Sequence, residues 1–321
     1  MFDVRAHVRT KQASFEQKFD AIQRGPGIYL IRHAQEGPSP MSPFSGMHRS
    51  PRTPSVWRMR DLLTTASDTI EADFAALQSA ISRSPSLSTA DEPDATVYWS
   101  SEPLTLLNVV ANARIAPDSV ATRAPGLLAP FFRRGLPFQW VTTPSTTTPA
   151  LEARLAQAGL LAREYPAMHT KLGAPIDPET PDDVFIDVAW PDGIEPASRA
   201  VLQALGHPAA QQDVTLGVLD TLDPSDNLFF VARSLRTGEV LGASTMHTRG
   251  ASVMLANIST TPAARGRGIG RALGATMMNR AASIGIQTAT MITNSRAYPT
   301  YVELGFRTQF TCVTWVWDPT R

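Results

Sequence analysis

The segment TTPAARGRGIGRALGATMMNRAASIG, residues 260–285, constrains the fold more than any other stretch of the chain. Residues 252–260, which lead into it, have the character of a β-strand. After residue 268, apolar side chains recur every three or four positions, which predicts a helix that stops at Gly285. Three glycines separate the strand from the helix: Gly266, Gly268 and Gly270. The unit is therefore a strand, a glycine-rich loop and a helix.

Such a loop suits a phosphate group. The first N–H groups of a helix have no partner inside it, and the helix dipole makes that end positive. Glycines let a ligand approach the backbone closely, and anions are stabilised there. Arg265, Arg267 and Arg271 add charged donors. The loop lacks the lysine of a Walker loop and fits the GxGxxG dinucleotide pattern poorly. An arginine-rich turn that merely caps a helix stays open as the alternative.

Two motifs together are more specific than the loop alone. Arg265, Gly268 and Gly270 form an RxxGxG pattern after a TxP sequence, and Tyr301 begins the later sequence YVELGF. Residues 183–318 therefore resemble the GCN5-related N-acetyltransferase (GNAT) superfamily. The resemblance implies the α+β class, with a mixed, mostly antiparallel twisted sheet and flanking helices. It also implies an acyltransferase that moves an acetyl group directly from acetyl-CoA, its co-substrate, to an amine.

The same resemblance implies which residues carry the chemistry. In the family the fourth strand has a bulge and diverges from the fifth, so the backbone of residues 258–260 is expected beside the pantetheine arm. Tyr301 stands at the general-acid position, with Tyr298 as a substitute and a core aromatic role as the alternative. Asn294 is either a ligand contact or a helix N-cap. The expected acetyl-CoA contacts are Ile258, Ser259, Thr260, Arg265, Gly266, Arg267, Gly268, Ile269, Gly270, Arg271 and Asn294. The three arginine side chains either reach phosphates or face solvent.

No general base is identified. Residues 251–260 contain neither Asp nor Glu. His247, at the end of the third predicted strand, is a candidate base, with an exposed and incidental histidine as the alternative. Water is able to take the proton of the amine instead. An acyl-CoA-binding sensor or pseudoenzyme without turnover is therefore kept as the alternative to an active enzyme.

The residues before 173 suggest a second, smaller α+β domain. Residues 61–83 have helical periodicity, and residues 136–172 follow the order strand, proline break, helix, glycine, strand. Gly159-Leu160 stands where a GNAT domain has Gly-Phe. This block resembles a degenerate GNAT copy that lacks both the RxxGxG loop and the tyrosine, and an unrelated α+β domain remains the alternative. The expected organisation is a poorly ordered leader at 1–58, the degenerate domain at 59–172, a linker at 173–182 and the acetyltransferase domain at 183–321.

The leader contains one competing motif. The sequence LIRHAQE around His33 resembles the phospho-accepting strand end of histidine phosphatases. Such an enzyme needs a large parallel sheet and a second phosphate-binding histidine, and the rest of the chain is accounted for by another fold. The match is interpreted as a coincidence.

Composition narrows the remaining possibilities. The chain has 29 basic and 29 acidic residues, so nothing points to a nucleic-acid or membrane-surface partner. Cys312 is the one cysteine, which excludes an intrachain disulfide, and the six histidines lack metal-ligand spacing. No apolar run is long enough to span a membrane, and no secretory signal is present. The sequence predicts a cytoplasmic, metal-free enzyme acting on a small-molecule amine or a peptide N-terminus, with its oligomeric state undetermined.

Overall fold

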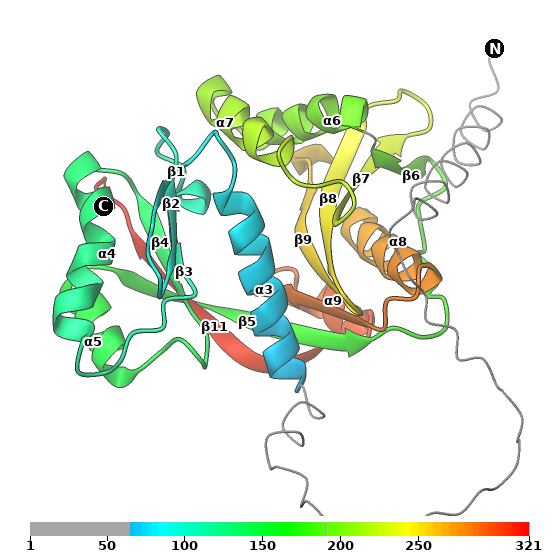
Figure 1. Cartoon of the computed structure of the whole chain (residues 1–321). Helices are drawn as coiled ribbons and strands as arrows, with labels where there is room; N and C mark the ends of the chain where they lie inside the picture. Colours follow the sequence, from blue (N-terminus) through cyan, green and yellow to red (C-terminus); the bar gives the residue numbers. More distant parts are fainter. Residues whose placement is uncertain (1–64, 190, 321) are drawn as a thin grey trace, which may run out of the picture. The chain divides into compact units, whose positions relative to one another are not determined.

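The computed structural model describes residues 65–189 and 191–320 (Figure 1). The leader expected at 1–58 and the motif at His33 lie outside these residues. The described strands form an 11-stranded sheet in the order β1-β2-β3-β4-β11-β5-β10-β9-β8-β7-β6. Only β3–β4 and β9–β10 pair in parallel within this described sheet, which confirms the expected mixed, mostly antiparallel α+β class.

The first half of the described chain is defined here as residues 65–172. Its elements are α3 (Ala66–Ser82), β1 (Ser88–Ala90), β2 (Thr96–Trp99), a 3-10 turn η1 (Thr105–Leu107), β3 (Val109–Ala111), α4 (Val120–Arg134), β4 (Phe138–Thr142), α5 (Pro149–Gln157) and β5 (Leu161–Lys171). The helix predicted within 61–83 is confirmed over Ala66–Ser82, and the strand–helix–strand order at 136–172 is confirmed.

The second half is defined as residues 183–320. Its elements are β6 (Val184–Ala189), α6 (Pro191–Ala204), α7 (Ala209–Leu219), β7 (Asn227–Ser234), β8 (Val240–Arg249), β9 (Ser252–Thr260), η2 (Pro262–Ala264), α8 (Ile269–Ser283), β10 (Thr288–Ile292), α9 (Tyr298–Glu303) and β11 (Arg307–Trp317). The strand, glycine loop and helix at 252–285 form as the sequence predicts.

Helices α4 and α7 are absent from the sequence-based prediction. Helix α4 contains Pro125 and Pro130, each of which removes a backbone donor and normally argues against a helix interior. Its Leu127, Leu128 and Phe131 side chains are nonetheless buried in one apolar cluster. Burial against the sheet therefore outweighs the unfavourable local propensity.

The two halves exchange their last strands. Strand β5 of the first half lies between β10 and β11, and β11 of the second half lies between β4 and β5. The two exchanged strands pair with each other antiparallel over most of their length. Each half therefore supplies a strand that the sheet of the other half needs.

The halves also repeat one another. The order β3-α4-β4-α5-β5 matches β9-α8-β10-α9-β11, and the first two strands of each series pair in parallel. Asn112, directly after β3, has φ 55° and donates to Thr96 Oγ1 at 3.2 Å. Asn257 on β9 has φ 54° and donates to Thr245 Oγ1, also at 3.2 Å. This shared, unusual backbone detail supports the interpretation of the first half as a degenerate copy.

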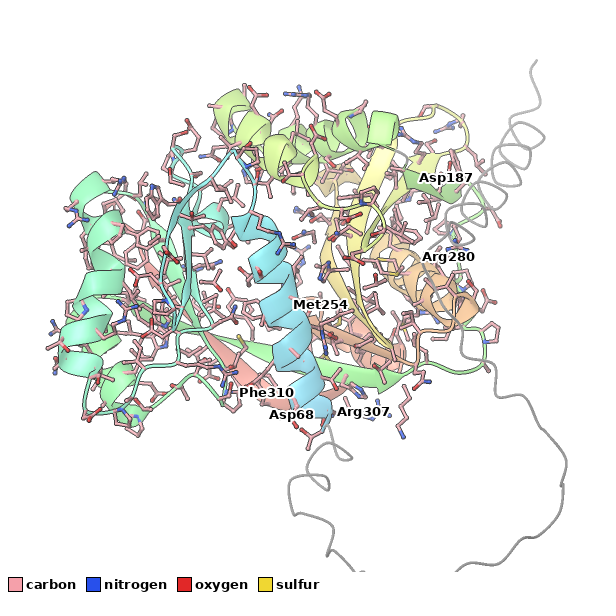
Figure 2. The ribbon with its side chains drawn as sticks, viewed as in Figure 1. Asp68, Asp187, Met254, Arg280, Arg307 and Phe310 are labelled. Atoms are coloured by element: carbon pink, nitrogen blue, oxygen red, sulfur yellow. The ribbon has the colours of Figure 1, made fainter. Side chains whose placement is uncertain are left out.

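Helices cover both faces of the sheet of the second half. Alternate residues of a strand point to opposite faces, and Val253 and Leu255 of β9 belong to the cluster that contains α8. Met254 of β9 instead belongs to the cluster that contains α3, together with Phe310 of β11 (Figure 2). Cys312 is buried in that same cluster, as expected. Helix α3 of the first half therefore lies on the face of β9 and β10 opposite α8.

Within residues 65–189 and 191–320, none of the helices has the length and apolar character that crossing a membrane requires.

Candidate functional site

Strand β9 carries a bulge at Asn257. The pairing of β8 with β9 changes register between Ala243, opposite Ser259, and Thr245, opposite Ala256. Gly242 lies beside this bulge, where an added Cβ would lie 2.7 Å from the carbonyl oxygen of Ser259. The close approach of the two backbones explains the glycine. A bulge in the fourth strand is what the family resemblance implies.

Strands β9 and β10 separate after Met254, before the bulge is reached. Their parallel pairing covers three positions, from Thr288 opposite Ser252 to Thr290 opposite Met254. The chain after β10 then bonds to the other neighbour, and the N–H of Thr293 donates to the carbonyl of Pro166 at 3.0 Å. We call the diverging part of β9 and β10 the fork.

A cavity of about 320 Å³ lies at the open end of the fork. Eight of the predicted site residues line it: Ile258, Ser259, Thr260, Arg265, Gly266, Gly270, Asn294 and Tyr301. Four residues that the sequence did not single out also line it: Leu205, Arg296, Ala297 and Thr300. Leu205 comes from the end of α6, and no sequence motif indicates that it reaches this place. Arg296 comes two residues after Asn294, so the prediction of Asn294 as a site residue was the sequence signal that could have indicated Arg296.

The glycine loop leaves the start of α8 open. Gly266 and Gly268 both have φ of 77°, a left-handed conformation that strains other residues. Gly268 is the N-cap of α8, and no side chain caps that end. The first N–H groups of α8 are therefore available to an anion. Gly268 and Ile269 are not among the residues that line the cavity, and the side chain of Ile269 packs in the core.

Two of the three loop arginines bind residues in the linker or directly after it. Arg267 donates to both carboxylate oxygens of Asp183 at 2.7 Å. Arg271 pairs with Glu179 at 2.9 Å and donates to the carbonyl of Asp177 at 3.1 Å. Arg265 lines the cavity and has no acidic partner within the described ranges. Arg265 is thus the loop arginine whose guanidinium is free to meet a phosphate.

Tyr301 presents a protonated phenol to the cavity. Its side chain is 5% exposed and packs edge-to-face on Phe306, with ring centroids 6.2 Å apart. Burial raises the pKa of Tyr301 to about 12, so the phenol stays protonated at neutral pH. The Tyr298 hydroxyl instead lies 3.4 Å from Thr308 Oγ1, and Tyr298 does not line the cavity. Of the two tyrosines, Tyr301 is the one placed at the site.

Asn294 lines the cavity and stabilises the turn before α9, but the N-cap of α9 is Ala297. The side-chain oxygen of Asn294 accepts from the N–H of Ala297 at 3.0 Å. The backbone carbonyl of Asn294 also accepts from the N–H of Tyr298. The two bonds together organise the turn before α9. The side-chain amide nitrogen of Asn294 remains to contact a ligand.

His247 is not at the site. It is 6% exposed, so the expectation of an exposed side chain is wrong, and its Nδ1 lies 2.9 Å from Asn227 Oδ1. Burial lowers the pKa of His247, against the opposing effect of Asp226. None of the described residues that line the cavity is an Asp, a Glu or a His. A protein base for the amine is therefore not found there.

The equivalent place in the first half is closed. Leu155 of α5 takes the position of Tyr301, because each starts a turn that ends in a left-handed glycine, Gly159 and Gly305 respectively. Leu155 packs with Ala113 and other apolar residues in one cluster. The chain between β3 and α4 contains no glycine. The first half therefore lacks the features that make the second-half cavity.

The comparisons with known proteins agree with this geometry. The family model described as "Acetyltransferase (GNAT) domain" matches residues 225–308. A GCN5-related N-acetyltransferase from Kribbella flavida has a similar structure, with a TM-score of 0.57 at 17% identity over 80% of this chain and 97% of that chain. One from Sphaerobacter thermophilus gives 0.53 at 16% identity over 80% and 94%. A functionally unknown conserved protein from Staphylococcus epidermidis gives 0.53 at 10% identity over 72% and 94%. No curated protein matches the sequence.

The described chain thus has the fold of GNAT proteins, and the similarity to the solved structures extends well beyond one half. Within its second half, residues 225–308 match the family model of the GNAT acetyltransferase domain. Members of that family are acyltransferases.

Proposed function

We propose that this protein transfers an acetyl group from acetyl-CoA to an amine. One observation carries the proposal: a single cavity is bordered by the bulged strand β9, the uncapped start of α8 and the phenol of Tyr301. These are the parts that a phosphate-bearing thioester needs for binding and for reaction. The amine belongs to a small molecule or to a peptide N-terminus.

The co-substrate is proposed to lie along the fork. Its pyrophosphate is held by the first N–H groups of α8 and by Arg265, because both supply positive charge at one rim of the cavity. Residues 258–260 supply backbone groups to the pantetheine amides, since β9 no longer pairs with β10 beyond Met254. Asn294 and Arg296 border the opposite rim.

The reaction is proposed to be a direct transfer. The neutral amine attacks the thioester carbon, the new C–N bond forms, and the C–S bond breaks with its electron pair going to sulfur. The extra proton of the amine passes to water, because no described base lines the cavity. Tyr301, with a pKa near 12, is a weaker acid than a thiol of pKa about 8.5. Its hydrogen bond therefore stabilises the leaving sulfur without complete proton transfer.

The decisive experiment adds one methyl group to the cavity wall. Gly270 lines the cavity, it has an ordinary helical φ, and an added Cβ there would meet no protein atom within 4 Å. Gly270→Ala should stabilise the helix by about 0.5–1 kcal/mol while obstructing the ligand. We expect acetyl-CoA affinity, measured by calorimetry, to fall about tenfold or more while the melting temperature of the free protein rises.

Gly126→Ala is the matched control. Gly126 is also a helical glycine with open space around its Cβ, but it lies in α4 of the first half. It should raise the melting temperature and leave acetyl-CoA affinity unchanged. If Gly270→Ala binds acetyl-CoA like the wild type, the ligand lies elsewhere.

A thermal shift and a turnover assay separate the classes of function. A ligand at about 100 times its dissociation constant stabilises the folded state by roughly 2.7 kcal/mol. We expect a shift with acetyl-CoA and CoA, none with NAD or ATP, and CoA release with at least one amine in a panel. A shift only with NAD or ATP contradicts the proposal. Binding of acetyl-CoA without CoA release on any amine would indicate a sensor rather than an enzyme.

A further inference from the structure

A carboxylate from the first half holds the closed end of the fork. Asp73, on α3, is 0% exposed. Its Oδ2 accepts from Ser252 Oγ on β9 at 2.5 Å and from Thr290 Oγ1 on β10 at 2.8 Å. Its Oδ1 accepts from Arg249 Nε on β8 at 2.7 Å. One side chain thus connects three neighbouring strands of the second half.

The two hydroxyl contacts span the short segment in which β9 and β10 pair. Ser252 is opposite Thr288 at the start of that segment, and Thr290 is opposite Met254 at its end. Because a single oxygen accepts from both strands, it fixes one strand relative to the other across the pair. The fork opens immediately after Thr290.

We call Asp73 together with its partners Ser252 and Thr290 the clamp. Because the clamp lies some distance before the cavity along both strands, a small change of angle at the clamp becomes a larger displacement at the cavity. The strand from Thr290 to Asn294 spans roughly 13 Å at about 3.3 Å per residue, so a rotation of roughly 5° at the closed end moves the tip by about 1 Å. Ile258 lies at a comparable distance beyond Met254 on the other arm. A misplacement of about 1 Å at reacting groups is able to reduce a rate roughly 100-fold.

We propose that Asp73 is a positioning residue for acyl transfer, which sets the separation of Ile258 and Asn294 by fastening Ser252 to Thr290. This inference rests on the proposed acetyltransferase function. It gives the degenerate first half a specific role in the reaction: it supplies the buried carboxylate that shapes the site of the second half. The pyrophosphate loop belongs to α8, on the opposite face of the sheet, and does not depend on this clamp.

The test removes a contact of the clamp by a substitution in the second half, so that the sequence of α3 is unchanged. Thr290→Val keeps the shape of the side chain but loses the hydroxyl, whereas Thr290→Ser keeps the hydroxyl. We expect Thr290→Val to lower kcat about 30- to 100-fold, while the dissociation constant for CoA rises by no more than about threefold because the pyrophosphate contacts at α8 are kept. Thr290→Ser should keep kcat within about threefold of the wild type. Asp73→Ala should match Thr290→Val in kcat if it folds.

Phe74→Leu is the control for general loosening of α3. Phe74 is buried in the cluster under α3 and makes no polar contact with the fork. It should lower the melting temperature and leave kcat unchanged below that temperature. The proposal is overturned if Thr290→Val keeps the wild-type kcat, or if Phe74→Leu lowers kcat as much at an equal loss of stability.

Hydrogen–deuterium exchange tests whether the clamp holds the fork, and it does so independently of enzyme turnover. In Thr290→Val, the amides of residues 255–260 and 291–294 should exchange faster than in the wild type, while those of α8 should not change. Unchanged exchange at the fork overturns the clamp. A wild-type protein that releases no CoA with any amine refutes the proposed function instead, and the exchange result still decides whether Asp73 holds the fork.

Discussion

At the scale of single residues, Tyr301 shows how the fold changes the chemistry of a side chain. An exposed phenol has a pKa of about 10, whereas burial raises the pKa of Tyr301 to about 12. The folded state therefore favours the neutral phenol, and it keeps a proton to donate toward the cavity over the whole neutral range. The first half has Leu155 at the equivalent place and offers no such donor.

The substitution Tyr301→Phe tests this role. The ring and its packing on Phe306 are kept, so acetyl-CoA affinity should stay within about threefold, while kcat falls about 100-fold because the leaving sulfur loses its donor. Since the folded pKa lies near 12, the ratio of wild-type to variant kcat should be constant from pH 7 to about pH 10. Stopped-assay pH profiles of both proteins measure the ratio.

Two outcomes would contradict this assignment. Unchanged kcat in Tyr301→Phe would mean that water or another group serves the leaving sulfur. A ratio that declines well below pH 10 would mean that the phenol ionises earlier than its burial implies. Tyr298→Phe is the control, because the Tyr298 hydroxyl lies near Thr308 and outside the cavity lining.

At the scale of elements, the bulge of β9 depends on its neighbour β8. Gly242 permits the close approach of the two strands at Ser259, and Ser259 lines the cavity. An asparagine with positive φ that donates to a threonine recurs at Asn112, directly after β3 in the first half. The first half therefore shares this asparagine conformation although it lacks the loop and the tyrosine.

Gly242→Ala should disturb that bulge. Its Cβ would lie 2.7 Å from a backbone oxygen, which cannot move aside without shifting β9. We expect a loss of stability of about 1–3 kcal/mol in urea unfolding. Acetyl-CoA affinity should fall as well, because residues 258–260 are displaced, and isothermal titration measures it. Unchanged affinity together with unchanged stability would show that β9 tolerates the shift.

At the scale of the whole molecule, the exchange of β5 and β11 makes the halves mutually dependent. Residues 173–321 alone would lack β5 and would leave the edges of β10 and β11 unpaired. Unpaired edges favour aggregation. We expect this fragment to be insoluble or unfolded by circular dichroism when it is expressed alone, and to be recovered as a complex when residues 59–172 are co-expressed.

Cleavage of the linker provides the control for this prediction. A protease site placed within residues 173–182 should cut the chain while the halves stay associated in size-exclusion chromatography, because the strand pairing is already formed. A fragment 173–321 that folds alone and binds acetyl-CoA would contradict the mutual dependence. The division into domains at 59–172 and 183–321 remains a prediction, since the described halves share one sheet.

The sequence by itself determined the elements whose signals are local. Periodicity and the spacing of glycines at 252–285 placed β9, the loop and α8, and the later YVELGF motif pointed to Tyr301. Eight of the predicted site residues line the cavity, because the glycine loop, the end of β9 and α9 are determined by patterns between residues close in the sequence. The helix α4 escaped prediction because its two prolines argue against a helix that only burial stabilises.

Only the tertiary structure decided the features that depend on long-range contacts. The pairing of β5 with β10 and β11 joins residues far apart in the chain, and so do the bonds of Arg267 to Asp183 and of Arg271 to Glu179. The burial of His247 likewise depends on how the strands and helices pack. Asp73 reads in the sequence as an ordinary polar position on an amphipathic helix. Its meeting with Ser252 and Thr290 depends on how α3 packs across the sheet, and no local pattern encodes that packing.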